Sequence, residues 1–338
     1  MSMSYDFGLH FLIGLQPSPT LTAHDQALLA EVRPAGITLF KGNFDRDQPE
    51  AIWRRRLADL LKRAQDAIRR EKILVALDHE GGRVHRTPAG ITHFPPARAY
   101  ADRAEAVATV MAAELQSIGV NFILAPCCDI DSNPQNPVIG DRSFGPDADS
   151  VTQAALAFLR GLKAAGMIGC AKHFPGHGDT DLDSHHALPR LPFSTAELAA
   201  RELLPFKALI AAGVPAVMTA HILFPAVAGD LPATLSPDIL TGILRQQLGF
   251  SGVIVSDDLG MKAIAPWFDA PEAAVQAVLA GCDLLCICAA QADTGKTRSM
   301  RNALAHATET ALQSGTGFAA AARDSQTRVA LLLNRLKV

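Results

Sequence analysis

The sequence contains no stretch in which basic residues accumulate. Its 31 Lys and Arg residues are scattered among 34 Asp and Glu residues, and the formal net charge is -3. Binding to nucleic acid or to an anionic membrane surface usually relies on a basic patch. We therefore expect neither as a partner of this protein.

Segments that would direct the chain to a membrane are also missing. Residues 1–18, MSMSYDFGLHFLIGLQPS, contain an apolar patch, but no Lys or Arg precedes Arg33. A secretory signal needs positive charge ahead of its apolar part, and no apolar run long enough to span a bilayer occurs elsewhere. These absences predict a cytoplasmic protein.

Linkers, low-complexity tracts and nucleotide-binding fingerprints are absent as well. Neither GxGxxG nor GxxxxGK[ST] occurs. Hydrophobic residues make up 49% of the 338 residues and charged residues 19%, which is enough apolar surface for a large core. We predict one globular domain over residues 1–338, a monomer that needs no cofactor.

Cysteine is too sparse for a disulfide scaffold, with six residues in the whole chain. Cys282, Cys286 and Cys288 fall in GCDLLCICAA, an apolar run typical of a buried strand. We interpret them as reduced thiols in the core, where free cysteine is usually found. A thiolate metal site is the alternative.

One pattern recurs along the chain: an Ala- and Leu-rich helical stretch, a glycine, and four to seven apolar residues that end in something polar. Glycine ends the helix, and the apolar run has the length of a strand buried on both faces. Eight such units favour a closed (β/α)8 barrel of the TIM type over an open sheet. The expected strands are Leu9–Leu15, Gly36–Phe40, Ile73–Asp78, Asn121–Ile130, Met167–His173, Ala216–His221, Gly252–Asp257 and Asp283–Cys288.

Polar side chains lie at the carboxyl ends of most of these strands. Active sites of such barrels lie at the carboxyl ends of the strands, where these side chains should converge on one pocket. They are Asp78, Asp129, Asp131, Lys172, His173, His221, Asp257 and Asp258.

The loop after the fifth strand is unusually polar. Residues 172–189, KHFPGHGDTDLDSHHALP, contain four of the eleven histidines. Residues 174–193 show no periodicity, and loops of this length in compact domains are usually functional. DTDLD begins like a calcium loop, but Ser184 and Arg190 stand where Gly and Glu are needed, and the HExxH motif of zinc enzymes does not occur. We predict no metal.

Asp183 and His185 are two residues apart in this loop. A carboxylate at that spacing can fix the tautomer of the imidazole and raise its basicity, which makes a proton shuttle. The alternative is a solvated loop whose aspartates cap turns. We assign His177, His186, Asp179 and Asp181 to loop shape.

In VIVSDDLGM, Asp257 and Asp258 cannot point the same way, because side chains alternate along a strand. One should enter the pocket, where a carboxylate on a rigid strand is well placed for nucleophilic attack. A buried ion pair or a helix cap would explain the other.

Two further motifs suit the binding of a sugar. ALDHEGGRVHR supplies Asp78, Arg83 and Arg86, and NPVIGDRSFG supplies Arg142. A carboxylate can accept hydrogen bonds from vicinal hydroxyls while cationic groups donate to other sugar oxygens. Surface arginine is the commoner explanation for each alone, and we interpret Glu80 as structural.

The motifs LDHEGGRV, VIGDRSFG, KHFPGHG followed by DSH, and SDDLGM together resemble glycoside hydrolase family 3. Their order and spacing are similar to those of bacterial β-N-acetylglucosaminidases of the single-domain type that acts in peptidoglycan recycling. The resemblance covers most of the chain, from the first strand to the eighth.

The resemblance implies that Asp257 is the nucleophile of a retaining exo-β-N-acetylglucosaminidase. His185, paired with Asp183, would be the acid/base. It also implies a cell-wall fragment as substrate, in which N-acetylglucosamine is β-1,4-linked to 1,6-anhydro-N-acetylmuramic acid, with or without a peptide. The residues that would hold the N-acetylglucosamine are Asp78, Arg86, Arg142, Lys172 and His173.

Other functions stay open. They include a broader β-hexosaminidase or β-glucosidase, a glycoside phosphorylase on the same scaffold and a non-catalytic sugar-binding protein. A metal hydrolase would lose activity in chelator, and a Schiff-base enzyme would use Lys172.

Overall fold

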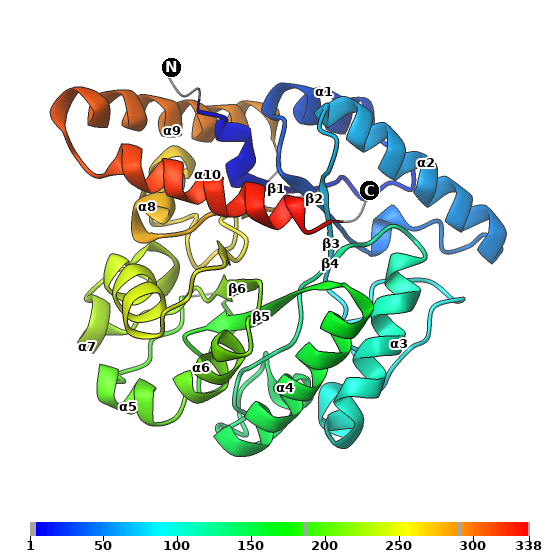
Figure 1. Ribbon diagram of the computed structural model, residues 1–338, viewed down its shortest axis with the longest axis horizontal. Helices are drawn as coiled ribbons and strands as arrows, with labels where there is room; N and C mark the ends of the chain where they lie inside the picture. The colour runs from blue at the N-terminus through cyan, green and yellow to red at the C-terminus, as the bar shows by residue number, and fades with distance from the viewer. Residues whose placement is uncertain (1–4, 185–187, 289–292, 337–338) are drawn as a thin grey trace.

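The computed structural model describes residues 5–184, 188–288 and 293–336, which form a barrel of parallel strands surrounded by helices (Figure 1). The strands adjoin in the order β7-β6-β5-β4-β3-β2-β1-β8, and the last gap is bridged between Val255 and Leu284, so the barrel is nearly closed. This confirms the predicted (β/α)8 barrel. The strands are β1 (Phe11–Gly14), β2 (Gly36–Leu39), β3 (Leu74–Leu77), β4 (Phe122–Ile123), β5 (Ile168–Phe174), β6 (Ala216–Thr219), β7 (Val253–Val255) and β8 (Leu285–Ile287).

Helices connect successive strands and cover the outside of the barrel. The longer ones are α1 (Ala23–Val32), α2 (Glu50–Ile68), α3 (Ala104–Gln116), α4 (Ala148–Ala165), α6 (Leu203–Ala211), η6 (Asp238–Gln247), α8 (Ala270–Ala280), α9 (Thr294–Ser314) and α10 (Phe318–Asn334). Shorter helical turns are η1 (Phe7–His10), η2 (Lys41–Asn43), η3 (Ala97–Arg103), η4 (Gly140–Arg142), α5 (Thr195–Ala200), α7 (Pro225–Ala228) and η5 (Ala233–Leu235).

The fourth strand is much shorter than the sequence pattern suggests. We expected a strand over Asn121–Ile130, but regular pairing is confined to Phe122–Ile123. Pro126 has no N–H to donate, so the ladder toward β5 becomes irregular there. The chain still follows β5, because Cys170 donates to the carbonyl of Ala125 (2.9 Å) and Cys128 to that of Lys172 (2.6 Å).

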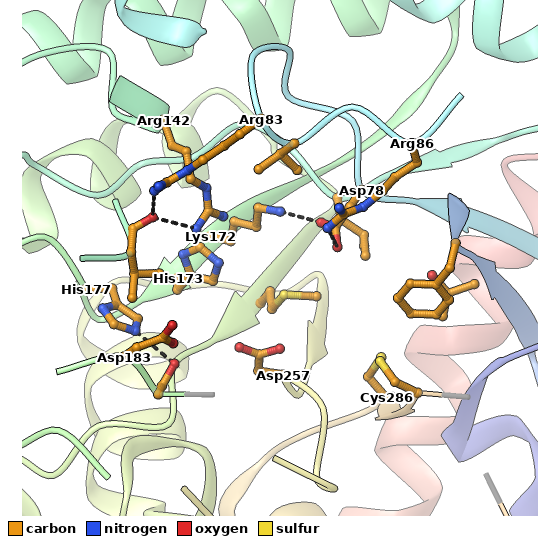
Figure 2. Close-up of a pocket in the computed structure, with 18 of the residues that line it drawn as sticks. Asp78, Arg83, Arg86, Arg142, Lys172, His173, His177, Asp183, Asp257 and Cys286 are labelled. Atoms are coloured by element: carbon orange, nitrogen blue, oxygen red, sulfur yellow. Dashed lines mark hydrogen bonds and ion pairs between the residues drawn. The ribbon is translucent and has the colours of Figure 1, made fainter. Parts of the chain in front are cut away.

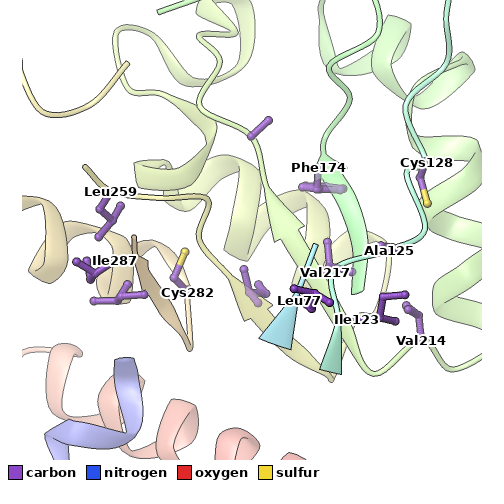
Figure 3. Close-up of a cluster of buried hydrophobic side chains, with 14 of the residues drawn as sticks. Leu77, Ile123, Ala125, Cys128, Phe174, Val214, Val217, Leu259, Cys282 and Ile287 are labelled. Carbon is purple, nitrogen blue, oxygen red and sulfur yellow. The ribbon is translucent and has the colours of Figure 1, made fainter. Parts of the chain in front are cut away.

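Side-chain alternation along the strands produces two separate apolar layers. In β3, Leu74 and Ala76 point into the barrel, whereas Val75 and Leu77 pack outward against the helices. Figure 3 shows part of the outer layer, including Leu77 and Phe174. All of these side chains are buried, so the strands are held rigidly from both faces.

Helix α10 completes the inner layer. Its residues Val329, Leu332 and Leu333, with Leu336 beyond the helix, belong to the same buried cluster as Leu12 and the other inward-facing side chains of the barrel. One end of the barrel is therefore filled by apolar side chains, and the polar site lies at the other end.

Candidate active site

A cavity of about 310 Å³ opens at the carboxyl ends of the strands. This is the position that the sequence analysis predicts for the site. Figure 2 shows the carboxylate of Asp257 beneath Lys172 and Asp78, with Asp183 on one side and Cys286 on the other. The lining includes seven residues assigned to the site from sequence, namely Asp78, Arg86, Arg142, Lys172, His173, Asp183 and Asp257. His185 lies outside the described residues.

Four of the polar residues at strand ends do not line this cavity. Asp129 lies behind His173, and Asp131 pairs with Arg98 at 2.8 Å on the surface. His221 bonds Thr234 and the carbonyl of Asp258. These residues fix the strand ends rather than face the cavity.

A network of opposite charges supports one side of the cavity. Glu80 accepts two hydrogen bonds from Arg142, both at 2.9 Å, and one ion-pair contact at 2.7 Å from the ammonium of Lys172. Lys172 also donates to Asp78 at 2.6 Å, and Arg86 lies 4.0 Å from the same carboxylate. We name Asp78, Glu80, Arg142 and Lys172 the charged network.

Neighbouring charges keep this network ionised. Burial by itself would raise the pKa of Glu80, but the cations of Arg142 and Lys172 hold it well below its ordinary value. Burial likewise opposes the charged form of Lys172, yet Asp78 and Glu80 raise its pKa. Glu80 therefore fits the structural role expected for it, because it positions two cations at the edge of the cavity.

The two adjacent aspartates at the end of β7 have different surroundings. Asp257 lines the cavity, and one of its carboxylate oxygens accepts the backbone N–H of Asp258 at 2.8 Å. Asp258 instead accepts the backbone N–H groups of Gly260 (3.0 Å) and Cys288 (3.1 Å), and burial raises its pKa. The pair therefore divides as alternation predicts, with Asp257 facing the cavity.

A second network supports the loop that follows β5. The buried carboxylate of Asp129 accepts the ring N–H of His173 (2.6 Å) and the backbone N–H of His177 (2.7 Å). The ring of His177 in turn bonds the hydroxyls of Thr180 (2.8 Å) and Ser184 (3.0 Å). We name Asp129, His173, His177, Thr180 and Ser184 the imidazole network.

The imidazole network places the end of the loop against the cavity. Burial and the neighbouring His173 lower the pKa of His177 to about 4, so its ring is neutral at neutral pH. Ser184 is anchored by that ring, and Asp183 and Ser184 both line the cavity. Asp183 thus reaches the cavity from the loop that follows β5.

Comparison with known proteins identifies the fold family. The model of the glycosyl hydrolase family 3 N-terminal domain matches residues 14–332. The chain belongs to this family. A β-hexosaminidase of Methylococcus capsulatus is 40% identical over 279 residues, which cover 80% of each chain.

Solved structures agree with this assignment. A family 3 β-N-acetylglucosaminidase from Paenibacillus sp. superposes with a TM-score of 0.87 at 36% identity, covering 99% of this chain and 62% of the larger one. A β-N-acetylhexosaminidase from Beutenbergia cavernae gives 0.86 at 28% identity and covers 99% of both chains. The resemblance seen in the sequence motifs is confirmed: this is a glycoside hydrolase of the β-N-acetylhexosaminidase type.

The family 3 enzyme has one group of three potential metal ligands among its described residues. Donor atoms of Cys127, Asp129 and His173 lie within 4.8 Å of one another. Asp129 already accepts four hydrogen bonds, from two backbone N–H groups, from the ring of His173 and from the thiol of Cys127 at 3.2 Å. The group therefore serves the imidazole network, and a cation would have to displace protons from it.

Several residues that line the cavity were not assigned to a site from sequence. Thr38 and Phe40 lie at and after the end of β2, and their position at a strand end is the signal that points to them. Cys286 and Cys288 also line the cavity, whereas Cys282 is in the core as predicted. No helix within the described parts of this hydrolase is both long and apolar enough to cross a membrane.

Proposed function

We propose that this hydrolase removes N-acetylglucosamine from cell-wall fragments by cleaving its β-1,4 bond to N-acetylmuramic acid or the 1,6-anhydro form. The observation that carries the proposal is the position of Asp257. Its carboxylate faces a cavity whose opposite side presents Asp78, Lys172 and Arg86 and whose loop side presents Asp183. The residues that we propose as nucleophile, as sugar-binding groups and as partner of the proton donor all line one cavity, which supports the proposal.

In the first half of the reaction, a carboxylate oxygen of Asp257 attacks the anomeric carbon and the bond to the leaving oxygen breaks. His185, oriented by Asp183, gives its proton to that oxygen. In the second half, His185 takes a proton from water, and the water oxygen displaces Asp257. An imidazole can do both because its ordinary pKa is close to neutrality. Two inversions at one carbon give net retention.

The charged network supports binding of the sugar. Asp78 accepts from hydroxyl groups, while Lys172 and Arg86 donate to other oxygens of the ring. His173 donates one ring N–H to Asp129, which leaves its other nitrogen as an acceptor in the neutral form. We assign Arg142 to the same binding function, supported by its place in the lining, although Glu80 receives two of its N–H groups.

The configuration of the first product tests the mechanism. Proton NMR during hydrolysis of an aryl β-N-acetylglucosaminide should show the β-anomer first, and release of the α-anomer would contradict a double displacement. A 2-fluoro glycoside with a good leaving group should become esterified to Asp257, as found by peptide mass mapping. A label on Asp258 would reverse the assignment within the pair.

Substrate comparison tests the specificity. We expect activity on the aryl β-N-acetylglucosaminide to exceed activity on the matching aryl β-glucoside, and the N-acetylglucosaminyl anhydromuramic disaccharide to be cleaved. Equal rates on the two aryl glycosides would indicate the broader enzyme. A sugar 1-phosphate formed in phosphate buffer would instead indicate a phosphorylase.

A further inference from the structure

Cys286 of β8 and Cys288, one residue beyond the end of that strand, both face the cavity. Cys286 and Cys288 are two residues apart, so their side chains leave the strand on the same side. Both line the cavity, with Cys286 buried and Cys288 half-buried. Cys282, from the same apolar run, packs into the outer layer instead and donates to the carbonyl of Thr234. The pair is therefore reached from the cavity, unlike the neighbouring core thiol.

The neighbouring thiols of Cys286 and Cys288 influence each other's pKa. The hydrogen bond with Cys286, together with burial, holds the pKa of the Cys288 thiol well above its ordinary value, and the pKa of Cys286 is raised too. Both groups are therefore protonated thiols at neutral pH. This disfavours ligands that need thiolates in advance, such as divalent cations and alkylating agents.

Backbone contacts fix the pair beside the nucleophile. The N–H of Cys288 donates to the carboxylate of Asp258 at 3.1 Å, and the N–H of Leu259 donates to the carbonyl of Cys286 at 3.1 Å. The N–H of Cys286 donates to the hydroxyl of Ser256 at 2.9 Å. Residues on both sides of Asp257 are thus bonded to this end of β8, and Figure 2 shows Cys286 next to Asp257 in the cavity.

We propose that Cys286 and Cys288 form a dithiol site for trivalent arsenicals, and that an arsenical bound there blocks the sugar end of the cavity. An organoarsenic oxide condenses with two thiols. Two S–H bonds and the bonds between arsenic and oxygen break, two As–S bonds form, and the oxygen leaves with both protons as water. Arsenic remains trivalent, so no oxidant or reductant is required. Binding of the arsenical to the two thiols does not depend on the proposed function. The expectation that it blocks sugar binding does rest on the proposed function.

Phenylarsine oxide is a suitable probe. We expect the full chain, treated with it and desalted, to retain one phenylarsenic group per chain by intact-mass measurement, and peptide mapping to place it on Cys286 and Cys288. Cys286→Ser and Cys288→Ser should each lower the affinity by about 10² to 10⁴-fold, because one linked contact is lost. Cys282→Ser is the matched control and should retain the adduct. Thermal melts establish that each variant is folded. If Cys286→Ser does not fold, Cys286→Ala takes its place in the binding measurement.

Two further measurements separate the parts of the proposal. 2,3-Dimercaptopropanol should remove the arsenical and restore activity, and N-acetylglucosamine should slow formation of the adduct. The dithiol site would be overturned if both serine variants retain the adduct. It would also be overturned if peptide mapping places the adduct on Cys127 and Cys128, which are consecutive in the sequence. An adduct at Cys286 and Cys288 that forms equally fast with and without N-acetylglucosamine would overturn the block alone.

Discussion

The two networks around the cavity are built from different interactions. In the charged network, Glu80 and Lys172 are both almost fully buried, and each is paired with more than one opposite charge. In the imidazole network, His177 is neutral and its ring contacts are hydroxyl groups. The first keeps its charge over a wide pH range, whereas the second depends on a ring that can gain a proton.

The difference corresponds to the place of each network in the barrel. Lys172 belongs to β5 and Asp78 and Glu80 follow β3, so three of the four members of the charged network are attached to strand ends, and Arg142 belongs to η4. Thr180 and Ser184 belong to the loop after β5. Under the proposed function, the groups that bind the sugar gain from preorganisation, while the loop that would carry the proton donor can be held by bonds that are easier to exchange. Four predictions test this division.

Replacing Asp257 should have the largest effect, because this residue belongs to neither network. Asp257→Ala is expected to reduce turnover by about 10⁴-fold or more, as removal of a covalent catalytic residue does. Calorimetry should still show binding of N-acetylglucosamine, and thermal unfolding should change little. Loss of sugar binding together with turnover would mean that Asp257 supports the charged network.

The second prediction concerns His185, which should act as a general acid. His185→Ala is expected to slow cleavage of the disaccharide by about 10² to 10⁴-fold, because the alkoxide leaving group needs a proton. The burst phase on a nitrophenyl glycoside should change far less, since nitrophenolate leaves without help. Asp183→Ala should also slow cleavage of the disaccharide more than it slows the burst phase on the nitrophenyl glycoside.

Asp179→Ala is the matched control in the same loop. Asp179 bonds Arg201 at 2.9 Å and Ser132 at 3.1 Å, and a partly exposed pair of this kind contributes only about 0.2 to 1 kcal/mol. Equal slowing of both leaving groups in His185→Ala would make the loop a binding element. The same conclusion follows if Asp179→Ala matches Asp183→Ala.

The third prediction compares Lys172 and Arg86, whose replacement should affect different quantities. One change should mainly lower the free energy of unfolding, and the other should mainly weaken sugar binding. Lys172→Ala leaves Glu80 and Asp78 without their shared partner, and breaking a buried pair costs about 3 to 5 kcal/mol of unfolding free energy. Arg86 is 4.0 Å from Asp78 and more exposed, so Arg86→Ala should chiefly weaken N-acetylglucosamine binding, by about 1.5 to 3 kcal/mol. Denaturant titration and calorimetry measure the two. Similar losses of stability in both variants would contradict the distinction.

The smallest effect is expected from pH acting on His177. Its pKa is about 4 in the folded protein and near 6.5 when unfolded, so the unfolded chain binds the proton first as pH falls. Its contribution to stability is complete above pH 6.5, declines between 6.5 and 4, and changes no further below 4. His177→Gln should flatten that part of the stability profile, as measured by denaturant titration at a series of pH values. An unchanged slope in His177→Gln would show that the ring does not titrate in this range.

The barrel was predictable because each strand is short, continuously apolar and preceded by glycine. Prediction of the fourth strand was wrong in its length, because regular pairing ends at Ile123 and only an irregular bridge to β5 continues past Pro126. The positions of Asp78 and Asp257 in the cavity lining were predictable, because Asp78 directly follows β3 and Asp257 lies two residues beyond β7. Side-chain alternation predicted that one of Asp257 and Asp258 faces the cavity, but not which one. In the structure Asp258 accepts backbone N–H groups, and Asp257 is the residue that faces the cavity.

The contacts behind the cavity could not be predicted in the same way. Nothing near Glu80 in the sequence shows that Arg142 and Lys172 converge on it, because those residues are 62 and 92 positions away. They meet because β3, β4 and β5 are neighbouring strands. Cys286 was placed in the core because a run of apolar residues buried on both faces does not reveal which side chains face the interior. The cavity itself supplies that information.

Helix α10 has a consequence for how the enzyme is made. Its side chains Val329, Leu332 and Leu333 fill the same inner layer as Leu12 of β1, and Arg328 bonds the buried carboxylate of Asp283 at 2.9 Å. During synthesis all eight strands leave the ribosome before this helix does. The apolar end of the nascent barrel is therefore exposed to water, and accessible to chaperones, until α10 has itself left the ribosome.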